Sequence, residues 1–378
     1  MSLVQFLSGK GEAYSNINIE RFPAFWCENQ QKFNLPKIVH IIGTNGKGST
    51  GRILACFCND RGLKTVHYSS PHIMKVNERF WLNGADANDE ELEQAHQSLQ
   101  HKIDSKWIKQ LSYFEYTTLL AIELSNNADI AILEAGLGGE YDATNAFSCD
   151  LLLITPIDYD HQHILGDTIE AIASTKINAV KSPAIIARQK HNEVYKIAEK
   201  ITAQKGQKLM LAKDLAPSCD HFAAMHDPMF MAINRQLAFA AANFLGLNPA
   251  VSQFKINPLF GRLTKIAPNV YIDVGHNISA AHALLEAFAN KRIILIYNSY
   301  SDKAYAAILH VLKPIVKKVL IIDVDHQRAV NRDDLIKALE KEHIEWSYFD
   351  GATTADETYL VFGSFSVAER FLKVFHAR

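Results

Sequence analysis

The sequence has no long apolar run: no stretch approaches the ~20 consecutive apolar residues that a membrane-spanning helix needs. Its first ten residues also lack the basic region, the apolar region and the cleavage site of a secretory signal. Five scattered cysteines are few among 378 residues, which argues against a disulfide framework or a zinc site. From these absences we expect a cytoplasmic protein with reduced thiols.

Neither sign of charge prevails, because 39 Lys and Arg residues face 41 Asp and Glu residues, for a net charge of −2. Without a basic field, the chain is not expected to bind nucleic acid or an anionic membrane, and a nucleic-acid motor is disfavoured. Its partners should therefore be small molecules. A length of 378 residues with 48% hydrophobic residues predicts two globular domains.

Apolar runs alternate with helical patterns, which predicts an α/β protein with largely parallel strands. We expect a first set of strands at residues 38–42, 65–68, 130–133, 151–155 and 184–187, with helices at 49–60, 89–100, 116–124, 168–173, 191–204 and 234–244. A second set has strands at 270–274, 292–297, 319–323 and 359–362, with helices at 279–289, 303–312, 332–340 and 366–375. Proline, glycine and polar residues at 257–265 indicate the joint, so the predicted domains are 1–262 and 263–378.

The most informative segment is the glycine-rich turn Gly43-Thr-Asn-Gly-Lys-Gly-Ser49, which lies between a predicted strand and a predicted helix. Glycines let the backbone approach phosphate oxygens, and the N–H groups at the start of a helix favour an anion. Lys47 would add a point charge for the β- and γ-phosphates. The turn is a compact variant of the general P-loop, because Ile41 stands where a glycine is usual and Gly48 follows the lysine directly. It predicts a nucleoside triphosphate site.

Polar residues also follow three other predicted strands, in Ser69-Ser-Pro-His72, at Glu134 and in the segment 158–166, which contains His161. The carboxyl ends of parallel strands share one edge of a sheet, where ligands bind. Glu134 could hold Mg²⁺, which prefers oxygen ligands. Seen alone, a carboxylate at a strand end is as often structural, and a lone histidine is more often a core residue.

Together these residues carry a family resemblance. The segments concerned are Gly43-Thr-Asn-Gly-Lys-Gly-Ser49, Ser69-Ser-Pro-His72, Asn77-Glu-Arg79, Leu133-Glu-Ala-Gly-Leu-Gly-Gly139, Asp142-Ala-Thr-Asn145, Asp160-His161 with Leu165-Gly166, and Asp273-Val-Gly-His-Asn277. They resemble the folylpolyglutamate synthases, often bifunctional with dihydrofolate synthase, within the Mur ligase superfamily. The resemblance covers nearly the whole chain in the family's order. It implies a P-loop parallel-sheet ATP-binding domain followed by a smaller Rossmann-like α/β domain.

The resemblance also implies an activity, an ATP-dependent amide ligase that adds L-glutamate to the carboxylate of dihydropteroate and of reduced folates. In this chemistry a γ-phosphoryl group passes to the acceptor carboxylate, and an amine attacks the acyl phosphate. The implied cofactors are ATP and Mg²⁺, and a monovalent cation is left open. Two-domain ligases of this kind are commonly monomers, so a monomer is expected.

Individual roles follow from the same resemblance. The ATP-binding residues would be Thr44, Asn45, Gly46, Lys47, Gly48, Ser49, Asn234, Arg262, Asp273 and His276, with Asn277 completing that edge. The metal would be held by Ser70, Glu134 and His161. Catalytic roles would fall to Lys47, His161 and Lys176, the last aligning with a family lysine that is carbamylated. The substrate-binding candidates are Arg79, Phe114 and Asp142, where Phe114 could stack on a pterin or belong to the core.

The sequence departs from the family pattern at several positions. Glu140 stands where arginine is common, and Thr175 replaces the glutamate that usually precedes the modified lysine. Phe260 replaces a proline, and Val274-Gly275 replace Gly-Ala. These departures leave the substrate preference and the lysine modification open, but they remove no central phosphate or metal residue.

Three alternatives stay open at this point. The chain could be a folylpolyglutamate synthase only, or another Mur-type amino-acid ligase, although the ~37 residues before the first strand offer little room for the extra domain of the cell-wall enzymes. It could also be a nucleotide-binding module that senses ATP without ligation. Lys47, Glu134, His161, Lys176 and Asp273 speak against this last reading.

Overall fold

The structure is a computed structural model that describes residues 1–11, 18–224, 228–254 and 259–376. The chain forms two compact units, one of residues 1–225 and 231–257 and the other of residues 226–230 and 258–378. The boundary expected from the sequence, between residues 262 and 263, falls inside the long segment of unit 2. Residues 257 and 258 of the predicted joint lie outside the described residues.

Unit 1 contains eight strands in one sheet. They are β1 (Lys37–Ile42), β2 (Thr65–Tyr68), β3 (Phe80–Leu82), β4 (Ala85–Asp86), β5 (Ile130–Glu134), β6 (Leu151–Ile154), β7 (Ala184–Ile186) and β8 (Leu209–Leu211). The order is β4-β3-β2-β5-β1-β6-β7-β8. The strands from β2 to β8 in this order are parallel, and β3 alone runs in the opposite direction, pairing antiparallel with both β2 and β4. The carboxyl ends of β2, β5, β1 and β6 therefore share one edge.

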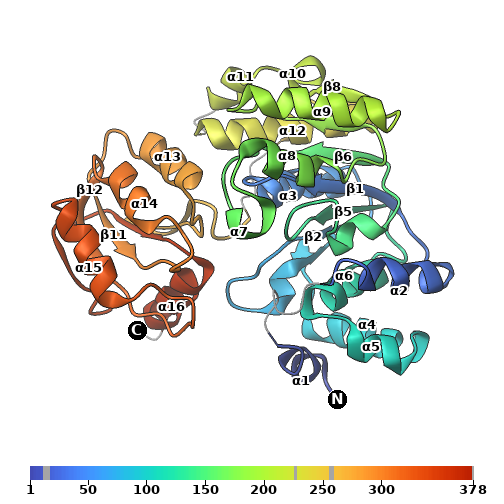
Figure 1. Cartoon of the computed structure of the whole chain (residues 1–378), viewed down its shortest axis with the longest axis horizontal. Coiled ribbons are helices and arrows are strands. Elements are labelled where there is room, and N and C mark those ends of the chain that lie inside the picture. The colour runs from blue at the N-terminus through green and yellow to red at the C-terminus, as the bar shows by residue number, and fades with distance from the viewer. Residues whose placement is uncertain (12–17, 225–227, 255–258, 377–378) are drawn as a thin grey trace. The chain divides into compact units, whose positions relative to one another are not determined.

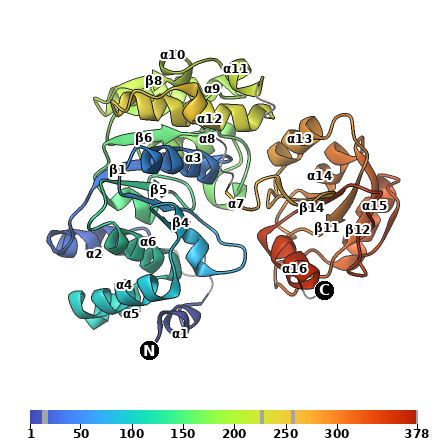
Figure 2. The same ribbon diagram turned by 180° about the vertical axis from the view of Figure 1, so that it is seen from behind.

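Helices cover the sheet of unit 1. They are α1 (Leu3–Ser8), α2 (Arg21–Asn29), α3 (Lys47–Asp60), α4 (Asp89–Lys102), α5 (Ser105–Gln110), α6 (Tyr113–Leu124), α7 (Gln162–Leu165), α8 (Ile169–Ile177), α9 (Asn192–Gln204), α10 (Ala212–Leu215), α11 (Cys219–Ala223) and α12 (Met229–Phe244). Short 3₁₀ turns are η1 (Gln30–Lys32), η2 (Val76–Arg79), η3 (Ala143–Ala146) and η4 (Val251–Gln253). Figures 1 and 2 show α9 to α12 gathered at one end of unit 1 and α4 to α6 at the other.

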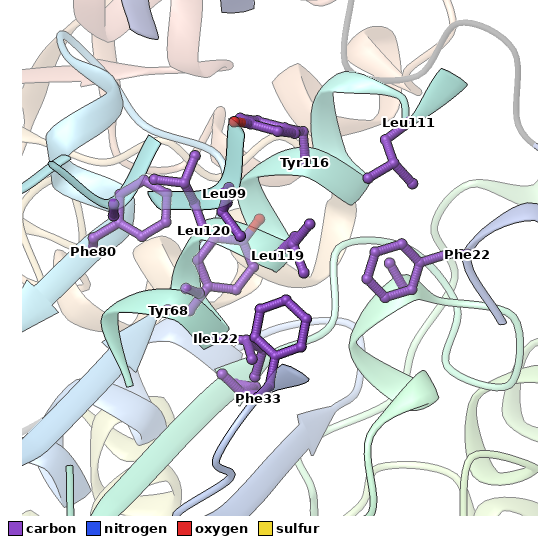
Figure 3. Close-up of a cluster of buried hydrophobic side chains, with 14 of the residues drawn as sticks. Phe22, Phe33, Tyr68, Phe80, Leu99, Leu111, Tyr116, Leu119, Leu120 and Ile122 are labelled. Atoms are coloured by element: carbon purple, nitrogen blue, oxygen red, sulfur yellow. The ribbon is translucent and has the colours of Figure 1, made fainter. Parts of the chain in front are cut away.

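The two faces of this sheet bury different sets of side chains, because successive residues of a strand point to opposite faces. Ile41 faces α3, since its side chain lies against the backbone at Gly51. Ile38 faces the other way, into an apolar cluster that contains residues of α2, α4 and α6. Figure 3 shows aromatic and leucine side chains of this cluster, among them Tyr68 and Phe80, packed together. A sheet buried on both faces explains why β1, β5 and β6 read as continuous apolar runs.

Unit 2 is a second α/β layer structure built on a six-stranded sheet. Its strands are β9 (Thr264–Ala267), β10 (Val270–Ile272), β11 (Ile293–Tyr297), β12 (Val316–Ile321), β13 (Trp346–Tyr348) and β14 (Tyr359–Phe362), in the order β13-β12-β11-β14-β10-β9. Its helices are α13 (Ile278–Ala287), α14 (Tyr305–Leu312), α15 (Arg332–Lys341) and α16 (Phe365–His376). All neighbouring strands are parallel except β9, which pairs antiparallel with β10.

The predicted α/β class with a largely parallel first sheet and a smaller second sheet is confirmed. Every strand and helix expected from the sequence is present, with ends displaced by a few residues. The sequence did not reveal the short strands β3, β4, β8, β9 and β13, nor helices α1, α2, α5, α7, α10 and α11. Among the described residues, none of the helices has both the length and the apolar composition to span a bilayer.

Candidate active site

The glycine turn joins β1 to α3 and takes the conformation that its sequence requires. Gly46 immediately precedes α3 with a φ of 87°, in the left-handed region that favours glycine. A side chain at Gly46 would also collide with the carboxamide of Asn234 on α12, so this predicted ATP-binding residue lies directly against the turn. The N–H groups of the first turn of α3 have no acceptor within the helix, and they supply positive potential for an anion.

Thr44 and Asn45 take a different part in the turn. Their N–H groups donate to the carbonyl of Pro156, at 3.0 and 3.2 Å. These two residues therefore fasten the turn to the segment after β6, and the N–H groups available to a phosphate come from the residues that follow them.

Lys47 lies among oxygen atoms at the turn. Its Nζ donates to the carbonyls of Gly43 and Thr44, at 3.2 and 3.3 Å, and lies 3.9 Å from Oε1 of Glu134. Glu134 ends β5 next to β1 and is 4% exposed. The other oxygen of Glu134 accepts the N–H of Ser70, at 3.2 Å. Residues from the ends of β1, β2 and β5 thus meet at one point.

His161 follows β6 and precedes α7, with a φ of 51°, which is uncommon for a residue with a side chain. Its Nε2 lies 3.9 Å from Oδ1 of Asp160. The histidine therefore stands at the same edge of the sheet as Ser70 and Glu134. A buried carboxylate, a serine and an imidazole offer ligand atoms that suit a divalent cation, with Glu134 providing the hard oxygen that Mg²⁺ prefers.

Lys176 on α8 is 4% exposed, and its Nζ donates to the carbonyl of Gly43 at 3.1 Å. Burial, reinforced by the positive charge of Lys47, lowers the pKa of Lys176 to about 7, although Asp160 and Asp142 oppose the shift. Much of this amine is therefore uncharged at neutral pH. An uncharged amine is the form that can react with CO₂ or another electrophile.

The substrate-binding candidates do not gather at one point. Arg79 is 3% exposed and donates from Nε to Nδ1 of His72 at 2.8 Å, with its guanidinium 5.2 Å from the centre of the Tyr113 ring. Phe114 packs partly against the buried cluster of unit 1, with its ring centre 6.1 Å from that of Tyr68. Both readings of Phe114, as core residue and as stacking surface, are compatible with a ring that is only partly buried.

Asp142 precedes η3 and uses its carboxylate within its own loop. Its oxygens accept N–H groups of Leu137 and Thr144, at 2.9 and 3.0 Å, and the Thr144 hydroxyl at 2.6 Å. Burial raises the pKa of Asp142, and these hydrogen bonds oppose the rise. The carboxylate therefore shapes the loop between β5 and β6.

A cavity of about 290 Å³ lies beside this loop in unit 1. Its lining residues are Ile19, Pro23, Trp26, Cys27, Gln30, Glu140, Tyr141, Asp142, Asn145, Ala146 and Lys181. Oδ1 of Asn145 is buried without a hydrogen-bond partner within the residues that the structure describes. Glu140 donates its N–H to the carbonyl of Thr175 at 3.1 Å, so the two main departures from the family pattern touch each other.

Three of the predicted residues of unit 2, Asp273, His276 and Asn277, follow β10. Asp273 accepts the N–H of Leu263 at 2.8 Å and that of Gly275 at 2.7 Å, and burial raises its pKa against the influence of Arg262 and these bonds. Nδ1 of His276 lies 3.1 Å from the carbonyl oxygen of Val274. Asp273 thus holds together the chain on both sides of β9 and β10.

The remaining predicted residues of unit 2 sit close by. The guanidinium of Arg262 stacks over Phe365, 5.2 Å from the ring centre. Asn277 caps α13 by accepting the N–H of Ala280 at 2.8 Å.

The sequence did not reveal that residues after β7 contact the segment that holds the phosphate turn. His191 received no functional role from the sequence, and its Nε2 lies 3.0 Å from Oδ1 of Asp158. Gln189 accepts the N–H of Ile157 at 2.9 Å. No local pattern connects residues more than thirty positions apart, so only the fold reveals these contacts.

Comparisons with known proteins identify the family of this chain. A family model described as Mur ligase, glutamate ligase domain, matches residues 261–363. The dihydrofolate synthase/folylpolyglutamate synthase of Haemophilus influenzae is 31% identical, over 90% of this chain and 89% of that protein. The protein of the same name from Escherichia coli is 30% identical, over 91% of this chain and 87% of its own length.

Solved structures give the same result. Helicobacter pylori folylpolyglutamate synthetase is 38% identical and superposes with a TM-score of 0.80, covering 100% of this chain and 98% of that one. Escherichia coli FolC in complex with DHPP and ADP is 25% identical with a TM-score of 0.83, covering 100% and 98%. The similarity spans both units, and this chain belongs to the dihydrofolate synthase/folylpolyglutamate synthase family of Mur ligases.

Proposed function

We propose that this chain is an ATP-dependent acid–amino-acid ligase that adds L-glutamate to the carboxylate of dihydropteroate and of reduced folates. The observation that carries the proposal is the meeting of Lys47, Glu134 and Lys176 around the glycine turn at one sheet edge. The substrate class rests on the relatives, which are named for both synthase activities. A folylpolyglutamate synthase alone, or a ligase for another carboxylate, is the alternative.

The chemistry needs activation of a carboxylate, which is a poor electrophile. A carboxylate oxygen attacks the γ-phosphorus, the bond to the bridging oxygen breaks, and ADP leaves with that electron pair. The amine of glutamate then attacks the acyl carbon, phosphate leaves, and the ammonium proton is lost to water. Lys47 and the N–H groups of α3 position the triphosphate and neutralise charge, which is the main requirement of phosphoryl transfer. No protein nucleophile is required.

Ser70, Glu134 and His161 are the residues that would hold Mg²⁺. The fit rests on the buried Glu134 carboxylate, which meets Lys47 on one oxygen and the Ser70 N–H on the other. Mg²⁺ would supply charge neutralisation at the β- and γ-phosphates.

Lys176 is our candidate for carbamylation. Its uncharged amine would form a nitrogen–carbon bond with CO₂ and lose one proton, which turns a buried cation site into an anion. The resulting carbamate would lie near Lys47, whose charge already acts on Lys176. The hydrogen bond from Lys176 to the carbonyl of Gly43 supports a role for this lysine beside the phosphate turn.

We assign the acceptor to the cavity that Asp142 lines, with Arg79 and Phe114 as further candidates. The aromatic side chains of Trp26 and Tyr141 are among the lining residues of this cavity and suit a heteroaromatic ring. Asn234, Arg262, Asp273 and His276 stay predicted ATP contacts. A monomeric enzyme in the cytoplasm, where ATP is supplied, completes the proposal.

The test measures ADP release by the purified chain with Mg-ATP and L-glutamate, comparing dihydropteroate, tetrahydrofolate and no acceptor. We expect release with both acceptors, and mass spectrometry should find each acceptor heavier by one glutamate. Release with tetrahydrofolate alone would leave a folylpolyglutamate synthase. ATP binding without release for either acceptor would overturn the folate assignment.

A further inference from the structure

The phosphate turn is tied to the segment that follows β6. Besides the two N–H groups that donate to Pro156, the Thr44 hydroxyl donates to the carbonyl of Asp158 at 3.0 Å and accepts the N–H of Asp158 at 3.1 Å. Four hydrogen bonds therefore join residues 44–45 to residues 156–158. The position of the turn depends on the position of this segment.

The side chain of Asp158 is in turn held by the chain after β7. Its Oδ1 is 3.0 Å from Nε2 of His191 and accepts the N–H of Tyr159 at 2.9 Å, while Oδ2 is 3.4 Å from Nζ of Lys190. The residue is only 7% exposed. A buried carboxylate with several donors is strongly held, because each donor would have to be replaced if it moved.

Gln189 strengthens the same connection. Its carboxamide accepts the N–H of Ile157 at 2.9 Å and donates to the carbonyls of Thr155 and Ala187, at 3.3 and 3.1 Å. Its own N–H donates to the hydroxyl of Tyr195 on α9 at 2.8 Å. The connection therefore runs from α9 through the β7 loop and residues 156–158 to the phosphate turn.

The negative charge of Asp158 is buried near the predicted triphosphate site, so it needs a partner. Burial opposes its ionisation, but the hydrogen bonds from His191 and Tyr159 and the charge of Lys190 outweigh burial and lower its pKa. An ionised carboxylate beside a triphosphate site would repel ATP if it stood alone. Paired with His191 and Lys190, it can hold the turn without that penalty.

We propose that Asp158 is a positioning residue for ATP, which, held by His191, fixes Thr44 and Asn45 of the phosphate turn through the backbone of residues 156–158. The inference rests on the proposed ATP-dependent function and adds a residue pair that lies outside the motifs of the turn itself. It concerns how tightly the nucleotide is bound and held, and Asp158 touches no reacting atom.

The test measures binding of Mg-ATP and Mg-ADP by titration calorimetry without an acceptor, together with KM for ATP and kcat in the full reaction. Asp158→Ala and His191→Ala both lose the charge-assisted hydrogen bond between these residues, which should weaken nucleotide binding and raise KM for ATP by about tenfold, with a smaller change in kcat. His191→Gln keeps a donor near the position of Nε2 and should stay within about twofold of the parent.

Two further variants guard against simple loss of folding. Glu123→Gln is the matched control, because the Glu123 side chain is a carboxylate of unit 1 that is only 7% exposed, with Lys102 and Ser98 each 2.6 Å away. Thr44→Val removes the hydroxyl that meets Asp158, and its effect should not add to that of Asp158→Ala.

The inference is overturned if Asp158→Ala and His191→Ala change nucleotide affinity no more than Glu123→Gln does. It is also overturned if His191→Gln is as impaired as His191→Ala. Because nucleotide binding is measured without a folate, either result is distinct from failure of the proposed function, which would show as absent glutamate-dependent ADP release.

Discussion

The carboxyl edges of the two sheets both carry ionisable side chains, but they hold them in different ways. In unit 1, Lys47 and Lys176 donate to backbone carbonyls of the phosphate turn, and Lys47 also lies 3.9 Å from Glu134. In unit 2, Asp273 uses both oxygens on backbone N–H groups of its own loop. A lysine amine at the end of a long side chain can turn from a backbone carbonyl to a ligand, whereas a carboxylate that accepts two N–H groups of its own loop is part of the fold.

Because of this difference, substitutions in the two units should have different effects on activity and stability. Substitutions at the edge of unit 1 should change chemistry more than stability, and substitution of Asp273 should change stability as well as function.

The largest effect is expected from Lys47→Ala. Because the ammonium group is the point charge aimed at the phosphates, its loss should lower kcat/KM for ATP by about a thousandfold. The melting temperature should change by only a few degrees. The measurement is glutamate-dependent ADP release beside a thermal melt, with the exposed Lys337→Ala as control. If the melting temperature of Lys47→Ala fell so far that unfolding alone explained the lost activity, Lys47 would be mainly structural.

Lys176→Met should lower the activity by about a hundredfold. The same substitution removes the free-energy cost of burying a charged amine. The folded pKa of about 7 lies below the unfolded value, so the unfolded chain binds more protons between these values and wild-type stability rises with pH there. The variant lacks this dependence. In CO₂-depleted buffer, the melting temperature of Lys176→Met minus that of the wild type should therefore be highest near pH 6.5 and should fall toward pH 9.5.

A pH-independent difference between the two melting curves would contradict the lowered pKa of Lys176. The activity measurement adds a second comparison, in which bicarbonate should restore CO₂-depleted wild-type enzyme but not Lys176→Met.

Asp273→Asn tests the other side of the comparison. The new amide group would face one of the N–H groups that the carboxylate now accepts, so unit 2 should lose about 1–3 kcal/mol of unfolding free energy. Asp302→Asn, which disturbs a pair with Arg328 near the surface, should cost less than about 1 kcal/mol. Urea unfolding of both variants gives the values. Equal losses would mean that Asp273 holds its loop no more firmly than a surface pair does.

The smallest effect is expected from Glu140→Arg at the rim of the unit 1 cavity. Exchanging a negative for a positive charge should lower KM for acceptors that carry glutamate carboxylates by roughly threefold, because repulsion is replaced by attraction. KM for ATP should not change, and Glu140→Gln should lie between. Equal shifts for dihydropteroate and for a polyglutamylated folate would argue against a charge effect.

The phosphate turn could be predicted because all its determinants lie within one short segment, from the apolar run of β1 to the start of α3. Glu134 and Ser70 were predictable for a related reason, since parallel order places the ends of neighbouring strands together. The longer elements were predictable from periodicity. Strands β3, β4 and β8 have only two or three residues, too few for a periodic signal.

Other features depend on contacts between distant segments. Nothing in the sequence indicates that Asp158 meets His191, or that Gln189 accepts the N–H of Ile157. The burial that lowers the pKa of Lys176 is likewise a property of the packed unit, because a helix lysine reads as exposed by default. Site residues that lie within one segment can be predicted from the sequence, whereas pKa shifts and ion pairs that arise from packing cannot.

Activation of the acceptor carboxylate is tested most directly by tracing its oxygen atoms into the released phosphate. Acceptor labelled with ¹⁸O in its reacting carboxylate is converted with Mg-ATP and L-glutamate, and the released phosphate is analysed by mass spectrometry. Activation through an acyl phosphate predicts one ¹⁸O atom in each phosphate, because the attacking carboxylate oxygen leaves with it. Phosphate free of ¹⁸O would contradict carboxylate activation at the phosphate turn.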